Sequence, residues 1–110
     1  MKYLEYKGYT GTIEYSQEDE ILYGKVIGIK GLISYEGNSG KDLENDFRVS
    51  IDEYIALCAS QGITPEKSFK GSFNVRIPTD LHKKAALLAL EEQVSLNSFV
   101  AESIRSRVMK

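Results

Sequence analysis

The first third of the chain alternates β-branched or aromatic residues with polar ones, a pattern typical of short strands in a sheet with one buried face. Two such runs cover residues 9–15 and 22–29, and the polar sequence SQEDE at residues 16–20 predicts a hairpin loop between them. A third strand is expected from about Gly31 to Glu36. These runs predict a small antiparallel sheet at the start of the chain.

Residues 39–62 carry the clearest helical pattern in this part of the chain. Ser39, with Asp42 three positions later, suits the N-cap of a helix, and Gly62 suits its C-terminal cap. Apolar residues recur between these caps at spacings of three and four, and they form one stripe: Leu43, Phe47, Ile51, Tyr54, Ile55 and Cys58. We expect this helix to cover one face of the sheet, which makes the fold class α+β.

A connector follows at residues 63–67, where Pro65 and three polar residues interrupt the helical pattern. It separates two predicted domains, residues 1–67 and 68–110. Beyond it, Lys70 to Ile77 alternates in the manner of a strand with two different faces. One face is apolar, with Phe73, Val75 and Ile77, and the other is polar, with Ser72, Asn74 and Arg76.

Two further helices are predicted after Pro78, which ends the strand. Thr79 is expected to cap the first, from about Asp80 to Glu92, and Ser95 is expected to cap the second. The inward-facing residues are Leu81, Ala85, Leu88 and Ala89 on the first helix, and Leu96, Phe99, Val100, Ile104 and Val108 on the second. The tail is therefore predicted to be one strand followed by two helices.

The formal net charge of −2 conceals a strong asymmetry along the chain. Residues 1–69 carry 7 Lys and Arg against 12 Asp and Glu, a balance of −5, whereas residues 70–110 carry 7 against 4, a balance of +3. The tail is therefore expected to attract polyanions such as nucleic acids, and the first part is expected to repel them.

Cysteine, histidine and hydropathy narrow the possible functions further. The single cysteine, Cys58, excludes an internal disulfide, and together with the single histidine, His82, it leaves too few ligands for a structural zinc site. We expect Cys58 to be a small core residue and His82 to face solvent without a catalytic role. No run of about eighteen apolar residues and no signal-peptide stretch is present. We therefore expect a cytoplasmic protein with no catalytic residues, metal, cofactor or membrane partner.

The predicted tail needs a partner, because a strand and two helices in about forty residues bury too little surface to be stable alone. A lone strand also leaves both of its edges unpaired. We therefore expect a homodimer in which residues 70–77 pair antiparallel with the same segment of a second chain. The dimer core then consists of Phe73, Val75 and Ile77 from both chains. The opposite, polar face lies on a two-stranded ribbon, which the major groove of B-DNA, about 12 Å wide, admits.

The side chains on this polar face suit the reading of DNA bases. Asn74 can pair bidentately with adenine, Arg76 can pair with O6 and N7 of guanine, and Ser72 can bond to either. Phosphates need a separate contact, and the start of the last predicted helix offers backbone amides at the positive end of its dipole. The residues expected at the phosphates are Ser95, Leu96, Asn97 and Ser98, with diffuse attraction from Lys70, Lys83 and Lys84.

Residues 72–78 (SFNVRIP) followed by residues 94–98 (VSLNS) resemble the ribbon-helix-helix family of repressors, which includes Arc repressor. The resemblance implies the base-reading role described above for the polar strand face. It also implies a phosphate clamp made by the amides near Leu96 and Asn97 and by the Asn97 side chain. Gln93 departs from the family pattern, which often has glycine there, so we expect the turn between the helices to be strained or differently shaped.

Three segments extend a second resemblance over nearly the whole chain. Residues 6–11 (YKGYTG), 23–29 (YGKVIGI) and 47–54 (FRVSIDEY) resemble the HicB antitoxins. This resemblance implies a partial ribonuclease-H-like first domain that covers a small RNA-cleaving toxin of the HicA type. It also implies a DNA-binding tail that represses the toxin and antitoxin genes. Toxins of this kind are basic, so an acidic first domain suits such a partner.

Two other functions remain open from the sequence. One is a stand-alone repressor whose first domain senses a ligand or oligomerises, and a short basic reading frame beside the gene distinguishes the antitoxin from it. The other is an enzyme whose first domain cleaves RNA, which needs carboxylates converging on metal ions. Most acidic residues of the first part fall on predicted loops or exposed faces, which argues against the enzyme. The favoured hypothesis is a dimeric antitoxin and autorepressor that binds operator DNA.

Overall fold

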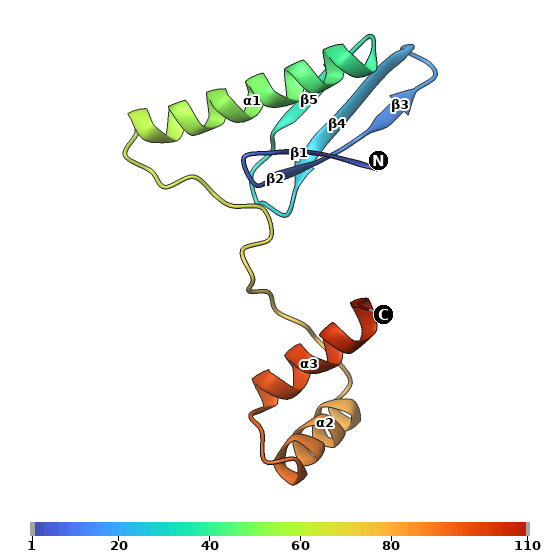
Figure 1. The fold of residues 1–110 in the computed structure, drawn as a ribbon, viewed down its shortest axis with the longest axis vertical. Helices are drawn as coiled ribbons and strands as arrows, with labels where there is room; N and C mark the ends of the chain where they lie inside the picture. Colours follow the sequence, from blue (N-terminus) through green and yellow to red (C-terminus); the bar gives the residue numbers. More distant parts are fainter. Residues whose placement is uncertain (1, 110) are drawn as a thin grey trace. The chain divides into compact units, whose positions relative to one another are not determined.

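The computed structural model describes residues 2–109, and the chain divides into two compact units between Ser72 and Phe73. We call residues 2–72 the front unit and residues 73–109 the tail unit. Within the described residues, the front unit is a five-stranded antiparallel sheet packed against one long helix, and the tail unit contains two shorter helices (Figure 1). This arrangement confirms the α+β class.

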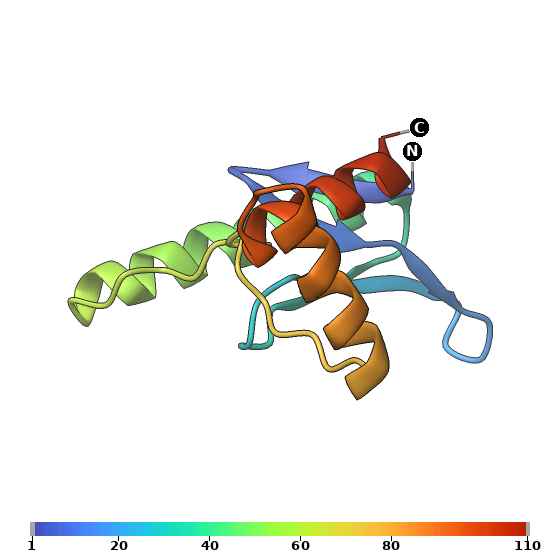
Figure 2. The same ribbon diagram turned by 90° about the horizontal axis from the view of Figure 1, so that it is seen from below.

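Every pair of neighbouring strands in the sheet is antiparallel. The strands are β1 (Tyr3–Tyr6), β2 (Tyr9–Thr12), β3 (Glu14–Ser16), β4 (Ile21–Ile27) and β5 (Ser34–Gly37). β2 and β3 pair with β4 in a single register, with Gly11 opposite Val26 and Glu14 opposite Tyr23. The turn at residues 17–20 joins β3 to β4 and confirms the predicted hairpin. Figure 2 shows this turn projecting beyond the end of the sheet.

β2 ends at Thr12 and β3 begins at Glu14, and the Tyr35 side chain accounts for this interruption. The Lys25 amide donates to Oγ1 of Thr12 at 3.0 Å, and the Thr12 carbonyl accepts instead from the Tyr35 hydroxyl at 2.7 Å. The Tyr35 side chain crosses Gly11 and Gly24, where a Cβ atom would collide with it. Burial raises the pKa of Tyr35 to about 12, so the hydroxyl remains protonated and keeps its donor at neutral pH.

The helix α1 (Gly40–Ser60) covers one face of the sheet. Oγ of Ser39 accepts from the Asp42 amide at 3.1 Å, which confirms the predicted N-cap. Gly62 has a φ of +67°, and the next amide donates back to the Cys58 carbonyl at 2.9 Å, so the predicted C-terminal cap is also confirmed. The buried part of the predicted stripe is Leu43, Phe47, Ile51 and Cys58. The sheet contributes Leu4, Tyr9, Val26 and Tyr35, and Ile33 joins them from just before β5.

The connector turns back after α1 towards the sheet (Figure 1). Hydrogen bonds hold it to the sheet, to the loop after β4 and to α1. The Glu66 carboxylate accepts from the amides of Lys30 and Gly31 at 2.9 and 3.1 Å, and its own amide donates to the Tyr54 hydroxyl at 2.8 Å. Oγ of Ser68 donates to the Ile27 carbonyl at 2.9 Å. The last such contact is between the Phe69 amide and the Gly28 carbonyl, at 3.1 Å. We call residues 64–69 the strap.

Two features of the sheet differ from the sequence prediction. β1 was not predicted, although Leu4 is buried in the core. The third predicted strand begins at Ser34 rather than near Gly31, because the amides of Lys30 and Gly31 bond to the strap instead of to a neighbouring strand. None of the helices in the described part of the chain has the length and apolar character needed to span a bilayer.

Candidate nucleic-acid interface

The tail unit consists of residues 73–78 followed by α2 (Thr79–Glu91) and α3 (Leu96–Val108). The predicted Thr79 cap is wrong, because α2 begins at Thr79 itself and has no side-chain cap. The Pro78 carbonyl instead accepts from the His82 amide at 3.0 Å, which makes Pro78 the capping residue. The predicted Ser95 cap is confirmed, since its Oγ accepts from the Ser98 amide at 3.0 Å.

The turn between the helices is strained at Gln93, as the sequence predicts. Gln93 has a φ of +59°, in the left-handed region that favours glycine. The Val94 amide donates to the Ala89 carbonyl at 3.0 Å, and the Gln93 amide donates to the Leu90 carbonyl at 3.1 Å. These two bonds form the same type of cap that Gly62 completes in α1. Ala89 is the only buried residue among those described in the tail unit.

The segment that the sequence predicts as a strand forms no strand in the single chain. Its apolar side chains are exposed to solvent, with Phe73 at 72%, Val75 at 62% and Ile77 at 42%. The backbone hydrogen bonds of the described residues include none between residues 73–77 and the front sheet. A strand needs a neighbour to bond to, and a single chain supplies none here.

An apolar groove of about 400 Å³ lies beside this segment. Its walls come from the end of the segment and from both helices, and include Ile77, Leu81, Ala85, Phe99, Val100 and Ile104. Several of these side chains are 40–50% exposed, although the sequence places them facing inward. A folded domain of this size rarely leaves so much of its apolar stripe uncovered. These apolar side chains are therefore available for a further contact.

The polar side chains of the segment are free to make external contacts. Ser72, Asn74 and Arg76 are exposed, and their side chains have no hydrogen bond or ion pair within the described part of the chain. Lys70 is exposed as well, at the end of the strap.

The N-terminus of α3 has two unsatisfied backbone donors. The Ser98 amide is occupied by the Ser95 cap, which leaves the amides of Leu96 and Asn97 without a partner among the described residues. No acidic residue lies in the first turn, and Arg105 and Arg107 lie in the last turn. The lack of acidic side chains in the first turn favours an anion at the start of the helix, whereas the two arginines complement the opposite end of the helix dipole. The sequence also predicts a free amide at Ser98, but that amide donates to the Ser95 cap and is not available to an anion.

Comparison with known proteins adds one match. The model of the HicB family matches residues 54–104, which run from the last turns of α1 through the strap to α3. The match covers slightly less than half of the chain, and it includes most of the tail unit. No curated protein and no solved structure matches the chain significantly.

Proposed function

We propose that the chain is a HicB-type antitoxin that neutralises a small RNA-cleaving toxin of the HicA type and represses its own genes as a DNA-bound dimer. The family match supports a role in a toxin–antitoxin system. The observation that carries the DNA-binding part is the exposed segment at residues 73–77 beside an open apolar groove. In this proposal the protein acts in the cytoplasm and catalyses no reaction.

The dimer completes the ribbon-helix-helix domain that the sequence predicts at residues 68–110, and its ribbon lies beyond the strap, within residues 70–77. Two copies of the segment pair antiparallel, and Phe73, Val75 and Ile77 of each chain cover the groove of the other. Burial of these exposed side chains stabilises the dimer by about 25 cal/mol for each Å² of apolar surface removed from water. The polar side chains of both strands then lie on the outer face of the ribbon.

The ribbon reads operator DNA in the major groove. Ser72, Asn74 and Arg76 contact base edges, because their donors and acceptors have no partner among the described residues and match the edges of adenine and guanine. The amides of Leu96 and Asn97 hold a backbone phosphate at the start of α3, flanked by Ser95 and Ser98, and Lys70 adds positive charge. The phosphate contacts position the ribbon, and the base contacts give it specificity.

The front unit covers the toxin. It has a partial ribonuclease-H-like arrangement in this proposal. It contains 12 Asp and Glu, against four in the tail unit, so it complements a basic protein and repels DNA. The two activities thus lie on different units of one chain.

The test is DNA binding by the full-length chain to the region upstream of its own gene. Asn74→Ala or Arg76→Ala is expected to weaken specific binding by about 1–3 kcal/mol for each lost bidentate pair. Arg105→Ala is the matched control for Arg76→Ala, because Arg105 is an exposed arginine of α3 that pairs with Glu102. Its substitution removes the same charge as the substitution of Arg76. The control should lose little affinity and no specificity. Fluorescence anisotropy with operator and scrambled duplexes measures both quantities.

Toxin neutralisation provides the second readout for the same variants. Co-expression with the neighbouring reading frame should restore growth for Asn74→Ala and Arg76→Ala as well as for the wild type. Loss of both activities in a folded variant contradicts the division of labour between the units. Equal loss of DNA affinity in the Arg105 control contradicts the base-reading role.

A further inference from the structure

The front sheet has a second face that α1 does not cover. The register places Tyr3, Thr12, Lys25 and Ser34 in one row across this face, and Glu14, Tyr23 and Glu36 in another. Tyr3 is 47% exposed and Tyr23 is 41% exposed. Tyrosines of this kind are enriched at protein interfaces, because they combine a large apolar surface with a hydroxyl.

A hollow of about 510 Å³ deepens this face at the hairpin end. Tyr23 lines it together with three carboxylate side chains from separate segments: Asp19 of the hairpin turn, Glu36 of β5 and Asp46 of α1. Asp46 is held in place because its Oδ2 accepts from the Glu36 amide at 2.9 Å. No lysine or arginine lines the hollow. The Glu36 side chain has no bonded partner within the described part of the chain.

The charge of this face decides between possible occupants. A second copy would bring this face, on which Glu14 and Glu36 stand against one lysine, Lys25, onto a face of the same net charge, and like charges at an interface cost several kcal/mol. Nucleic acid is excluded for the same reason. A basic protein surface instead brings a lysine or arginine that lies over the Tyr23 ring between the two flanking carboxylates.

We propose that the open face of the front sheet, centred on the row Glu14–Tyr23–Glu36, is the docking surface for a basic protein that inserts a cationic side chain into the adjoining hollow. This inference rests on the proposed function, because the basic protein of that function is the toxin. It goes further by assigning the toxin to the sheet face rather than to α1. The cationic side chain takes a position between carboxylates that no lysine or arginine of the described residues occupies.

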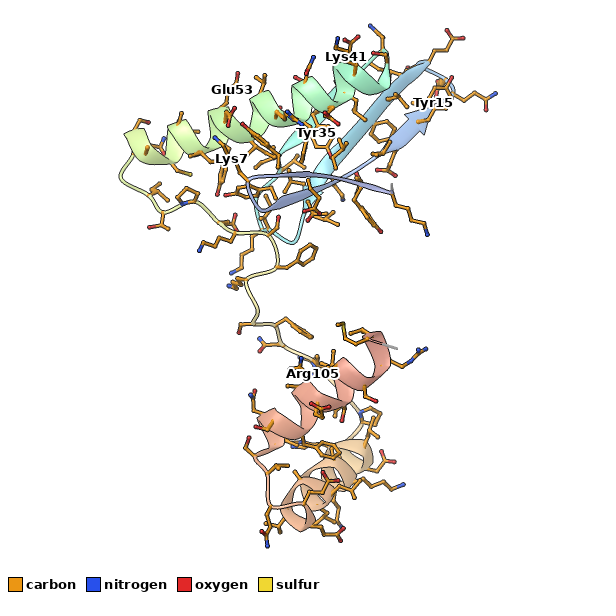
Figure 3. The ribbon with its side chains drawn as sticks, in the orientation of Figure 1. Lys7, Tyr15, Tyr35, Lys41, Glu53 and Arg105 are labelled. Carbon is orange, nitrogen blue, oxygen red and sulfur yellow. The ribbon has the colours of Figure 1, made fainter. Side chains whose placement is uncertain are left out.

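The experiment measures binding of the full-length chain to the protein encoded by the adjacent reading frame, separated from the co-expressed complex by denaturation and refolded. The double variant Glu14→Gln and Glu36→Gln removes two charges and keeps both side-chain shapes. Glu53→Gln is the control, since Glu53 is an exposed glutamate of α1 (Figure 3). Circular dichroism and operator binding confirm that each variant is folded.

We expect the double variant to bind at least about ten-fold more weakly, with a shallower dependence on salt, whereas Glu53→Gln binds like the wild type. Tyr23→Ser should also weaken binding, and the amide signals of β4 and β5 should shift when the partner is added. Unchanged affinity of the double variant, with the wild type binding normally, overturns the docking surface and leaves the proposed function intact. Failure of the wild type to bind overturns both. Self-association that depends on Glu14 and Glu36 also overturns the docking surface.

Discussion

Gln93 occupies a backbone conformation that costs a side-chain-bearing residue about 1–2 kcal/mol, and its φ is +59°. Glycine adopts this conformation without that cost but loses more entropy on folding, about 0.5–1 kcal/mol. We therefore expect Gln93→Gly to stabilise the tail by roughly 0.5–1 kcal/mol. Gln93→Ala is the control and should bring no gain. Thermal unfolding of the three proteins at equal concentration measures the difference, and a loss of stability in Gln93→Gly contradicts the strain.

Tyr35 connects the two halves of the front sheet through its hydroxyl, which donates to the Thr12 carbonyl. Removal of the hydroxyl leaves that carbonyl without its partner, so Tyr35→Phe should destabilise the front unit by about 1–3 kcal/mol. Tyr15→Phe is a matched control, because Tyr15 is 60% exposed and its hydroxyl has no bonded partner within the described residues. Figure 3 labels both side chains. Urea unfolding, followed through the amide signals of the sheet, should separate the two variants.

Capping residues show which local features the sequence predicts. Ser39, Gly62 and Ser95 act as expected, because each cap depends on atoms within a few residues. Thr79 fails because the Pro78 carbonyl already starts the helix. The contact of Tyr35 with Thr12 joins residues 23 positions apart, and no local pattern indicates it.

Whole strands and helices, like the caps, are predicted well where local sequence determines them and poorly where distant contacts do. β1 was missed because it is short, and only one of its four residues is buried. α1 was predicted well because its apolar stripe repeats over many turns. Residues 70–77 have a clear alternation, but a strand forms only when another strand bonds to it. The strand predicted for this segment is absent from the single chain, so it stays a prediction that depends on a second chain.

The exposed segment provides a prediction about assembly. Val75→Lys places a charge where the proposed dimer buries an apolar side chain, so we expect loss of the dimer and of operator binding. Leu32→Lys is the control, because Leu32 is 78% exposed in the front unit and should tolerate the charge. Sedimentation velocity measures the dimer. A dimer that survives Val75→Lys contradicts the proposed pairing.

The strap provides a prediction about pH. The amides of Lys30 and Gly31 bond to the Glu66 carboxylate and hold its pKa below the usual value of 4.5. Because the folded pKa is the lower one, the stabilisation is fully present above about pH 4.5 and is lost as the pH falls through the folded value. We expect Glu66→Gln to reduce hydrogen-exchange protection of the Lys30 and Gly31 amides at neutral pH. Its difference from the wild type should vanish in acid, and a difference that does not depend on pH contradicts this role.

At the scale of the molecule, the two units carry opposite charge preferences within one chain. The tail unit is positive and the front unit is negative, so raised salt should weaken both the DNA complex and the complex with a basic partner. DNA affinity should fall steeply, since each phosphate contact releases counterions and so contributes to the slope. The affinity of Asn74→Ala for DNA should keep the wild-type slope, because Asn74 is uncharged. A shallower salt dependence of DNA affinity in that variant would contradict the assignment of Asn74 to a base contact.

The pairing of residues 70–77 with a second copy is tested most directly by nuclear Overhauser effects between chains. A full-length sample mixed from isotope-labelled and unlabelled chains gives signals only between different chains. The account predicts contacts between chains among Phe73, Val75 and Ile77, in the order required by an antiparallel pair. The absence of such contacts between chains would contradict it.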